Sequence, residues 1–160
     1  MELKTKINAE AGKQDLTITR EFDLPLELLF RAHTEPGIIE QWMSNPHTTA
    51  KVLKFEAKKQ GGYQLESTDA HGNVVFRSNG VIHEFILNAK ITRTFEMDNA
   101  PFGVQLEVYA FEQLTDNTSK LNMHLIFESV ALRDQLLKLP FAQGLNMAHN
   151  RMQEILNTFK

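Results

Sequence analysis

The sequence predicts an α+β fold in which a long amphipathic C-terminal helix closes over a curved antiparallel sheet. Between Thr48 and Phe127, β-rich segments alternate with turn sequences, and no stretch there is long enough to form the helix of a parallel crossover. After Pro140, apolar residues recur at steps of three and four, the spacing of one helix face. The chain has 160 residues, 42% of them hydrophobic, which is enough for one domain.

The N-terminal part of the chain predicts one strand followed by two short helices. Residues 1–14 show little periodicity, so we expect a flexible tail or a loosely held strand start, with residues 15–160 forming a single domain. Alternating β-branched residues predict a strand at Asp15–Phe22. Helical spacing follows at Pro25–His33 and at Glu35–Met43, each with a proline near its start, where the missing N–H is no loss.

Six further strands are expected, which gives a sheet of about seven. They lie at Ala50–Ala57, Tyr63–Thr68, Val74–Phe85, Ile91–Met97, Val104–Leu114 and Lys120–Phe127. In the last of these, Leu121, Met123 and Leu125 share one face, so one face of the sheet is covered and the other is exposed to water.

The strand Val104–Leu114 has an irregular pattern. Leu106 and Val108 are expected to face inward with their neighbours on adjacent strands. Further along, the apolar positions shift to Tyr109 and Phe111, which predicts a β-bulge.

The covering element is the C-terminal segment, where a short helical piece at Val130–Leu139 precedes the long helix. The apolar stripe of the long helix comprises Phe141, Leu145, Ala148, Met152, Ile155 and Phe159. A polar stripe beside it comprises Asn146, His149, Gln153 and Asn157. Such stripes usually face solvent, although His149 or Gln153 could border the interior.

Composition excludes several classes of function. There is no cysteine, hence no disulfide, thiolate metal site or Cys nucleophile. The net charge of −3 is scattered along the chain, which argues against a nucleic-acid partner. The first fifteen residues contain no continuous apolar stretch, so we expect neither a signal peptide nor a membrane segment, and a cytoplasmic location. The six histidines have no ligand spacing, so neither a metal nor a cofactor is expected.

Several motifs, taken in order, resemble a known family. The run Phe22–Pro36, followed by Trp42, resembles the opening of the START-related (SRPBCC) superfamily, and is most similar to the branch named for the activator of Hsp90 ATPase homologue. Gly61-Gly62, Gly72 and Gly80–Glu84 before Lys90–Phe95 match in the same order, so that the resemblance covers Leu16 to Phe159. It implies a helix-grip fold. One departure is that Gly144 is followed by Leu145, where this branch often has tryptophan.

The resemblance also implies a cavity between the long helix and the concave sheet, where many relatives hold apolar or amphipathic small molecules. The alternative is that side chains fill this space as a solid core. The candidate cavity residues are Trp42, Phe55, Tyr63, Leu65, Phe76, Arg93, Phe95, Leu106, Val108, Met123, Leu125, Leu145, Ala148, His149 and Met152.

Two of these candidates have more than one interpretation. Trp42, the only tryptophan, either stacks on a ligand or anchors the two short helices to the sheet. Arg93 has inward parity, and its guanidinium either pairs with Glu107 or Glu84, or binds a ligand carboxylate.

Three functions follow from the resemblance. The first is non-enzymatic binding of an apolar or amphipathic small molecule by a monomer or homodimer, with no catalytic residue. The second is a co-chaperone-like module that contacts an Hsp90-type chaperone, although the activator proteins have an additional N-terminal domain and only a short segment precedes Leu16 here. The third is an enzyme of the cyclase or hydrolase type, whose acid and base would come from Glu84, Arg93, Glu107 and His149.

Overall fold

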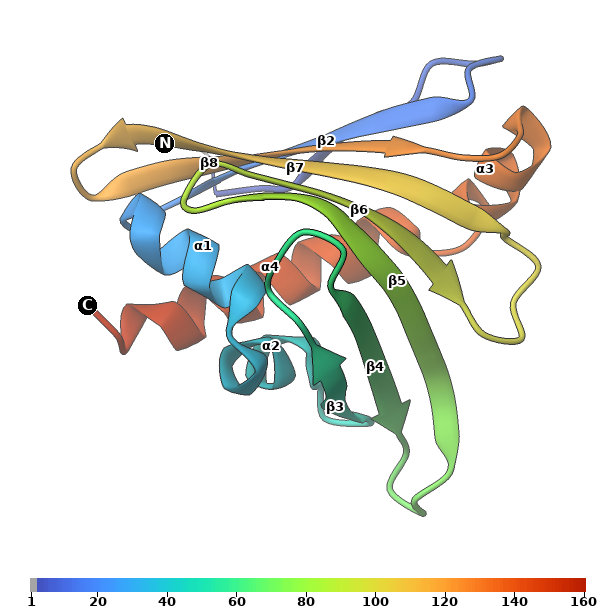
Figure 1. Ribbon diagram of the computed structural model, residues 1–160, viewed down its shortest axis with the longest axis horizontal. Helices are drawn as coiled ribbons and strands as arrows, with labels where there is room; N and C mark the ends of the chain where they lie inside the picture. Colours follow the sequence, from blue (N-terminus) through green and yellow to red (C-terminus); the bar gives the residue numbers. More distant parts are fainter. Residues whose placement is uncertain (1–2) are drawn as a thin grey trace.

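One eight-stranded antiparallel sheet curves around helix α4 (Phe141–Asn157) in the computed structural model, which describes residues 3–160 (Figure 1). The order across the sheet is β1-β2-β8-β7-β6-β5-β4-β3. The strands are β1 (Lys6–Asn8), β2 (Asp15–Phe22), β3 (Thr49–Phe55), β4 (Gly62–Thr68), β5 (Val74–Ile86), β6 (Lys90–Met97), β7 (Val104–Thr115) and β8 (Thr118–Ile126). The predicted fold class is confirmed, and β1 is a strand beyond the seven expected.

The other helices lie where the spacing predicted them. They are α1 (Leu26–Thr34), α2 (Pro36–Met43) and α3 (Val130–Leu137). Pro36 is the first residue of α2, and the Ser129 side chain caps α3 by accepting a hydrogen bond from the Leu132 N–H. Helices α1 and α2 lie on the same side of the sheet as α4, so three helices cover the concave face (Figure 1).

Strand β7 differs from its prediction. Gln105, Glu107, Tyr109 and Phe111 are its buried residues, whereas Leu106 is 37% exposed and Val108 lies with it on the outer face. The expected inward orientation of Leu106 and Val108 is therefore wrong. The alternation runs unbroken, and the irregularity in pairing with β8 comes only after Gln113. The polar residues can face inward because Glu107 has buried partners, described below.

The polar stripe of α4 also differs from the usual pattern. His149 and Gln153 are buried, because the N-terminal segment covers His149 and the backbone of Asp23 covers Gln153. Thr5 donates its backbone N–H to Asn146 Oδ1 at 3.0 Å, and its hydroxyl lies 2.7 Å from His149 Nδ1. The Gln153 amide exchanges hydrogen bonds with the backbone of Asp23. The solvent-facing interpretation is therefore wrong for His149 and Gln153, whose stripe joins α4 to the start of the chain.

Part of the segment expected as a tail or loosely held strand is thus bonded to the rest of the fold, and its first two residues lie outside the described part of the chain. Residues 6–8 pair with β2 as strand β1. The buried guanidinium of Arg133 in α3 donates to the carbonyls of Glu10 and Asp15, at 2.8 and 2.9 Å. These bonds hold the loop between β1 and β2 against α3.

Candidate functional site

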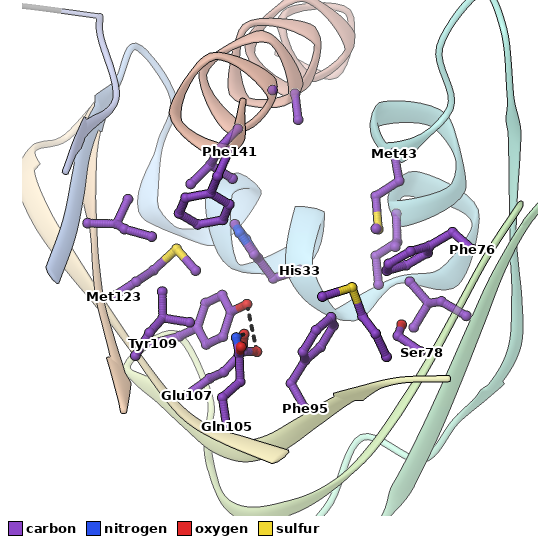
Figure 2. Close-up of a pocket in the computed structure, with 18 of the residues that line it drawn as sticks. His33, Met43, Phe76, Ser78, Phe95, Gln105, Glu107, Tyr109, Met123 and Phe141 are labelled. Carbon is purple, nitrogen blue, oxygen red and sulfur yellow. Dashed lines mark hydrogen bonds between the residues drawn. The ribbon is translucent and has the colours of Figure 1, made fainter. Parts of the chain in front are cut away.

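A cavity of about 650 Å³ lies between α4 and the concave face of the sheet. Its walls come from α1, α2 and α4, from strands β2 to β8 and from the corner between α3 and α4. Most of the lining side chains are apolar, and Phe76, Phe95, Met123 and Phe141 project into the space (Figure 2). The volume lies within the range of small-molecule sites, roughly 300 to 1,000 Å³. The interior is therefore hollow rather than a solid core.

The structure brings most of the predicted cavity residues to this space. Those that line it are Trp42, Phe55, Tyr63, Leu65, Phe76, Arg93, Phe95, Met123, Leu125, Leu145, Ala148 and His149. Leu106 and Val108 do not, because they lie on the outer face of β7. Met152 is fully buried within the hydrophobic core and does not line the cavity either.

One wall of the cavity carries a cluster of four polar side chains, which we call the Arg93–Glu107 cluster and which consists of Arg93, Gln105, Glu107 and Tyr109. Arg93 and Glu107 are direct partners in the pairing of β6 with β7, and Arg93 Nε lies 2.9 Å from Glu107 Oε1. Tyr109 donates its hydroxyl to the same oxygen at 3.1 Å (Figure 2). Gln105 donates to the other oxygen, Oε2, at 2.7 Å. Both oxygens of Glu107 therefore already accept hydrogen bonds.

The Arg93 guanidinium lies between two aromatic rings. Its central carbon is 4.4 Å from the centre of the Tyr63 ring and 4.8 Å from that of Tyr109, both within the range of a cation–π contact. Burial alone lowers the pKa of Arg93, but the oxygens of Tyr109 and Glu107 outweigh it and raise the pKa above its ordinary value. Arg93 is therefore a charged, fixed member of an ion pair. Glu84, its other predicted partner, pairs with Lys90 outside the cavity.

Tyr63 reaches Arg93 because the residue opposite it on β5 is a glycine. Tyr63 and Gly80 are paired in the β4–β5 register, and the Tyr63 hydroxyl donates to the backbone carbonyl of Thr94. A Cβ atom on residue 80 would lie 2.5 Å from Tyr63 Oη and 2.6 Å from its Cε1, and would also contact the Thr94 carbonyl. Only a residue without a side chain fits there.

His33 on α1 projects into the cavity (Figure 2). Its Nδ1 lies 2.9 Å from the backbone carbonyl of Leu29. Because a carbonyl can only accept, Nδ1 carries the proton, and Nε2 of the neutral ring is left as an acceptor. Burial lowers the pKa of His33 to about 4, although the bond to Leu29 opposes this shift. The ring is therefore neutral near pH 7.

His149 on α4 and Trp42 on α2 also line the cavity. Burial lowers the pKa of His149 to about 3, so this ring is neutral as well. Trp42 donates its indole N–H to the carbonyl of Ala32 at 2.7 Å, which anchors α2 to α1. Its own carbonyl accepts from Arg151 on α4 at 3.1 Å. Trp42 therefore anchors the two short helices and also lines the cavity.

Within residues 3–160, no group of three or more His, Asp or Glu side chains is arranged to hold a metal ion. None of the helices in that range is both long enough and apolar enough to cross a bilayer.

The comparison with protein families identifies the chain. The model of the family described as activator of Hsp90 ATPase homolog 1-like protein matches residues 23–157. The chain belongs to this family. Its match covers α1 to α4 and therefore nearly all of the cavity wall. Among the curated proteins, none matches this chain.

Solved structures place this family member in a widely shared fold. A protein from Rhodobacter sphaeroides superposes with a TM-score of 0.88 at 18% identity, over 97% of this chain and 99% of that one. Protein Ms6760 from Mycobacterium smegmatis superposes with a TM-score of 0.83 at 18% identity, over 94% of this chain and 95% of that one. A protein from Arthrobacter aurescens superposes with a TM-score of 0.83 at 18% identity, over 96% of this chain and 91% of that one. At such identities the likeness establishes the fold alone.

In this family member, sequence reasoning missed most of the polar groups in the cavity. They are His33, Ser78, Gln105 and Glu107, together with the hydroxyl of Tyr109. Glu107 is predicted as a partner of Arg93 and as a candidate acid or base, but not as a residue that lines the cavity. The alternation of Gln105, Glu107 and Tyr109 in β7 is the signal that could indicate them, but polar residues usually face solvent and the apolar Leu106 and Val108 favour the opposite face.

Proposed function

We propose that the protein binds an apolar or amphipathic small molecule in this cavity and does not transform it. The observation that carries the proposal is the hollow of about 650 Å³, which is lined mainly by apolar side chains and has a small polar cluster on one wall. A site of this kind buries the apolar part of a ligand and orients it through a few hydrogen bonds.

The titratable groups of the cavity support binding rather than catalysis. A general acid or base works best with a pKa near the working pH. Burial instead raises the pKa of Tyr63 and of Tyr109 and lowers that of His33 and His149, so all four stay neutral near pH 7. Arg93 is held as a cation by Glu107.

The test is occupancy of the cavity, with a variant that fills it. Because Trp42 is the only tryptophan and lines the cavity, its fluorescence reports on a bound molecule. We expect wild-type protein to bind a hydrophobic dye such as 8-anilinonaphthalene-1-sulfonate, and natively purified protein to release a small molecule on denaturation, detected by mass spectrometry.

Ala148→Phe puts a ring into the cavity from α4 and should abolish dye binding. The matched control is Met147→Phe, one residue earlier in α4, where the side chain is 51% exposed and does not line the cavity. A wild-type protein that binds no dye and releases nothing contradicts the proposal, as does an Ala148→Phe variant that binds like wild type.

Contact with an Hsp90-type chaperone is the second candidate, and it is supported by the family match over residues 23–157. It is tested by measuring the ATPase rate of the chaperone at saturating protein, in parallel with a pull-down. An unchanged rate and no co-purification count against it. This test does not involve the cavity, so the Ala148→Phe variant should behave like wild type in it.

A further inference from the structure

The charges of Arg93 and Glu107 cancel each other in the cavity wall, and Arg151, which also lines the cavity, donates to the carbonyl of Trp42. Arg93 and Glu107 form one ion pair, and their side chains are 18% and 6% exposed. A ligand carboxylate beside Arg93 would also lie beside Glu107, and it would either meet a like charge or displace the existing partner of Arg93. A ligand ammonium beside Glu107 would meet Arg93 in the same way. An uncharged ligand encounters neither cost.

Among the polar side chains that line the cavity, His33 offers an uncharged ligand an acceptor whose protonation is fixed by a backbone hydrogen bond. Within residues 3–160, Nε2 of His33 receives no hydrogen bond from the protein, whereas Nδ1 donates to Leu29. No buried side-chain nitrogen or oxygen in that range lacks a partner, so this free atom must be accessible. The space that His33 lines is the cavity (Figure 2).

His33 also lies next to the Arg93–Glu107 cluster. Its ring packs edge-on against Tyr109, with the ring centres 5.8 Å apart. The Tyr109 hydroxyl is already used, since it accepts from Arg93 Nη2 at 2.9 Å and donates to Glu107. A ligand hydroxyl that reaches this wall can therefore donate to His33 without displacing a hydrogen bond of the cluster.

We propose that the cavity selects uncharged ligands that carry a hydroxyl group, which donates its hydrogen bond to Nε2 of His33, and that it discriminates against carboxylates. This inference rests on the proposed function and adds the chemical class of the ligand. An alcohol keeps its hydrogen bond on leaving water, whereas a carboxylate loses its hydration beside Glu107.

The test compares matched probes with the wild-type protein at pH 7.5, followed by Trp42 fluorescence and isothermal calorimetry. The probes are 1-decanol, its isomer 1-methoxynonane, which accepts but cannot donate a hydrogen bond, and decanoate. A second set built on a ring, 4-cyclohexyl-1-butanol and 4-cyclohexylbutanoate, covers bulkier shapes. We expect each alcohol to bind about tenfold more tightly than its carboxylate, and decanol about fivefold more tightly than the ether, as one net hydrogen bond gives.

Two variants locate the selectivity. His33→Phe keeps a ring at this position but removes the acceptor, so decanol and 1-methoxynonane should bind equally. Glu107→Gln leaves the charge of Arg93 without its partner, and the affinity for decanoate should rise about tenfold while that for decanol changes little. Circular dichroism checks that each variant is folded. The comparison of the probes on wild-type protein does not depend on either variant.

The outcomes separate this inference from the proposed function. If decanoate binds wild-type protein as tightly as decanol, whether through Arg93 or through the half-buried Arg151 that also lines the cavity, the inference is overturned and the binding function stands. The same holds if decanol and the ether bind equally to wild type. If no probe binds and the dye does not bind, both are overturned.

Discussion

Gly80→Ala is expected to lower the free energy of unfolding by about 1.5 to 5 kcal/mol. The new Cβ would lie 2.5 Å from the Tyr63 hydroxyl and would also meet the backbone carbonyl of Thr94. Overpacking of this kind costs about 1 to 3 kcal/mol. Moving the Tyr63 ring also weakens its contact with Arg93, which is worth about 0.5 to 2 kcal/mol. The Thr94 carbonyl belongs to the paired strand β6, so a side-chain rotation cannot relieve that part of the clash.

The assay is urea unfolding followed by circular dichroism, in which the midpoint should fall with little change in slope. The matched control is Gly37→Ala in α2, where a Cβ meets no atom within 4 Å and the backbone is helical. This control should be neutral or gain up to about 1 kcal/mol. If Gly80→Ala is as stable as Gly37→Ala, the close packing of Tyr63 on the sheet is not what the structure describes.

Three further predictions concern stability. Folding lowers the pKa of His33 to about 4 and that of His149 to about 3, so the unfolded chain binds more protons than the folded protein below its own histidine pKa of about 6.5. Stability should be full above that pH and fall by about 2 kcal/mol per histidine by pH 5, with a smaller fall in His33→Phe. The absence of any fall would mean that both rings are solvated. Arg133→Met leaves two backbone carbonyls without their buried donor, so the free energy of unfolding in urea should fall by about 2 kcal/mol or more. A loss of less than about 0.5 kcal/mol would contradict this prediction. Leu106→Thr on the outer face of β7 should change the free energy of unfolding by about 0.5 kcal/mol or less, whereas Phe111→Ala on the inner face should lower it by about 3 to 5 kcal/mol in the same assay. Equal losses for the two variants would mean that Leu106 faces inward.

The extent of the elements could be predicted from the sequence because the signals for it are local. The strand at Asp15–Phe22 has the predicted bounds, and the start of α4 at Phe141 follows Pro140 as expected. Turn residues and side-chain periodicity report on neighbours within a few positions, and these neighbours are the ones that decide where an element begins and ends.

The direction of polar side chains could not be predicted in the same way. Glu107 faces inward because Arg93 lies opposite it on β6, and His149 is buried because Thr5 covers it from the far end of the chain. Those partners are remote in sequence, so a hydrophobicity pattern assigns both residues to solvent. The inward parity of Arg93 was predicted, and of its three possible partners, Glu107, Glu84 or a ligand carboxylate, the structure shows Glu107, which lies directly opposite Arg93 on β7.

The pairing of β2 with β8 has a consequence for the order in which the protein folds. Asp15 lies opposite Ile126, and Thr5 meets His149 on α4, so the pair of strands β1 and β2 cannot join the rest of the sheet until almost the whole chain has been synthesised. Contacts so distant in sequence make folding slow and leave a sheet edge open in the meantime. The hollow beneath α4 is therefore completed last. A small molecule meets it only in the finished protein, where occupancy would slow the return to the unfolded chain by stabilising the native state alone.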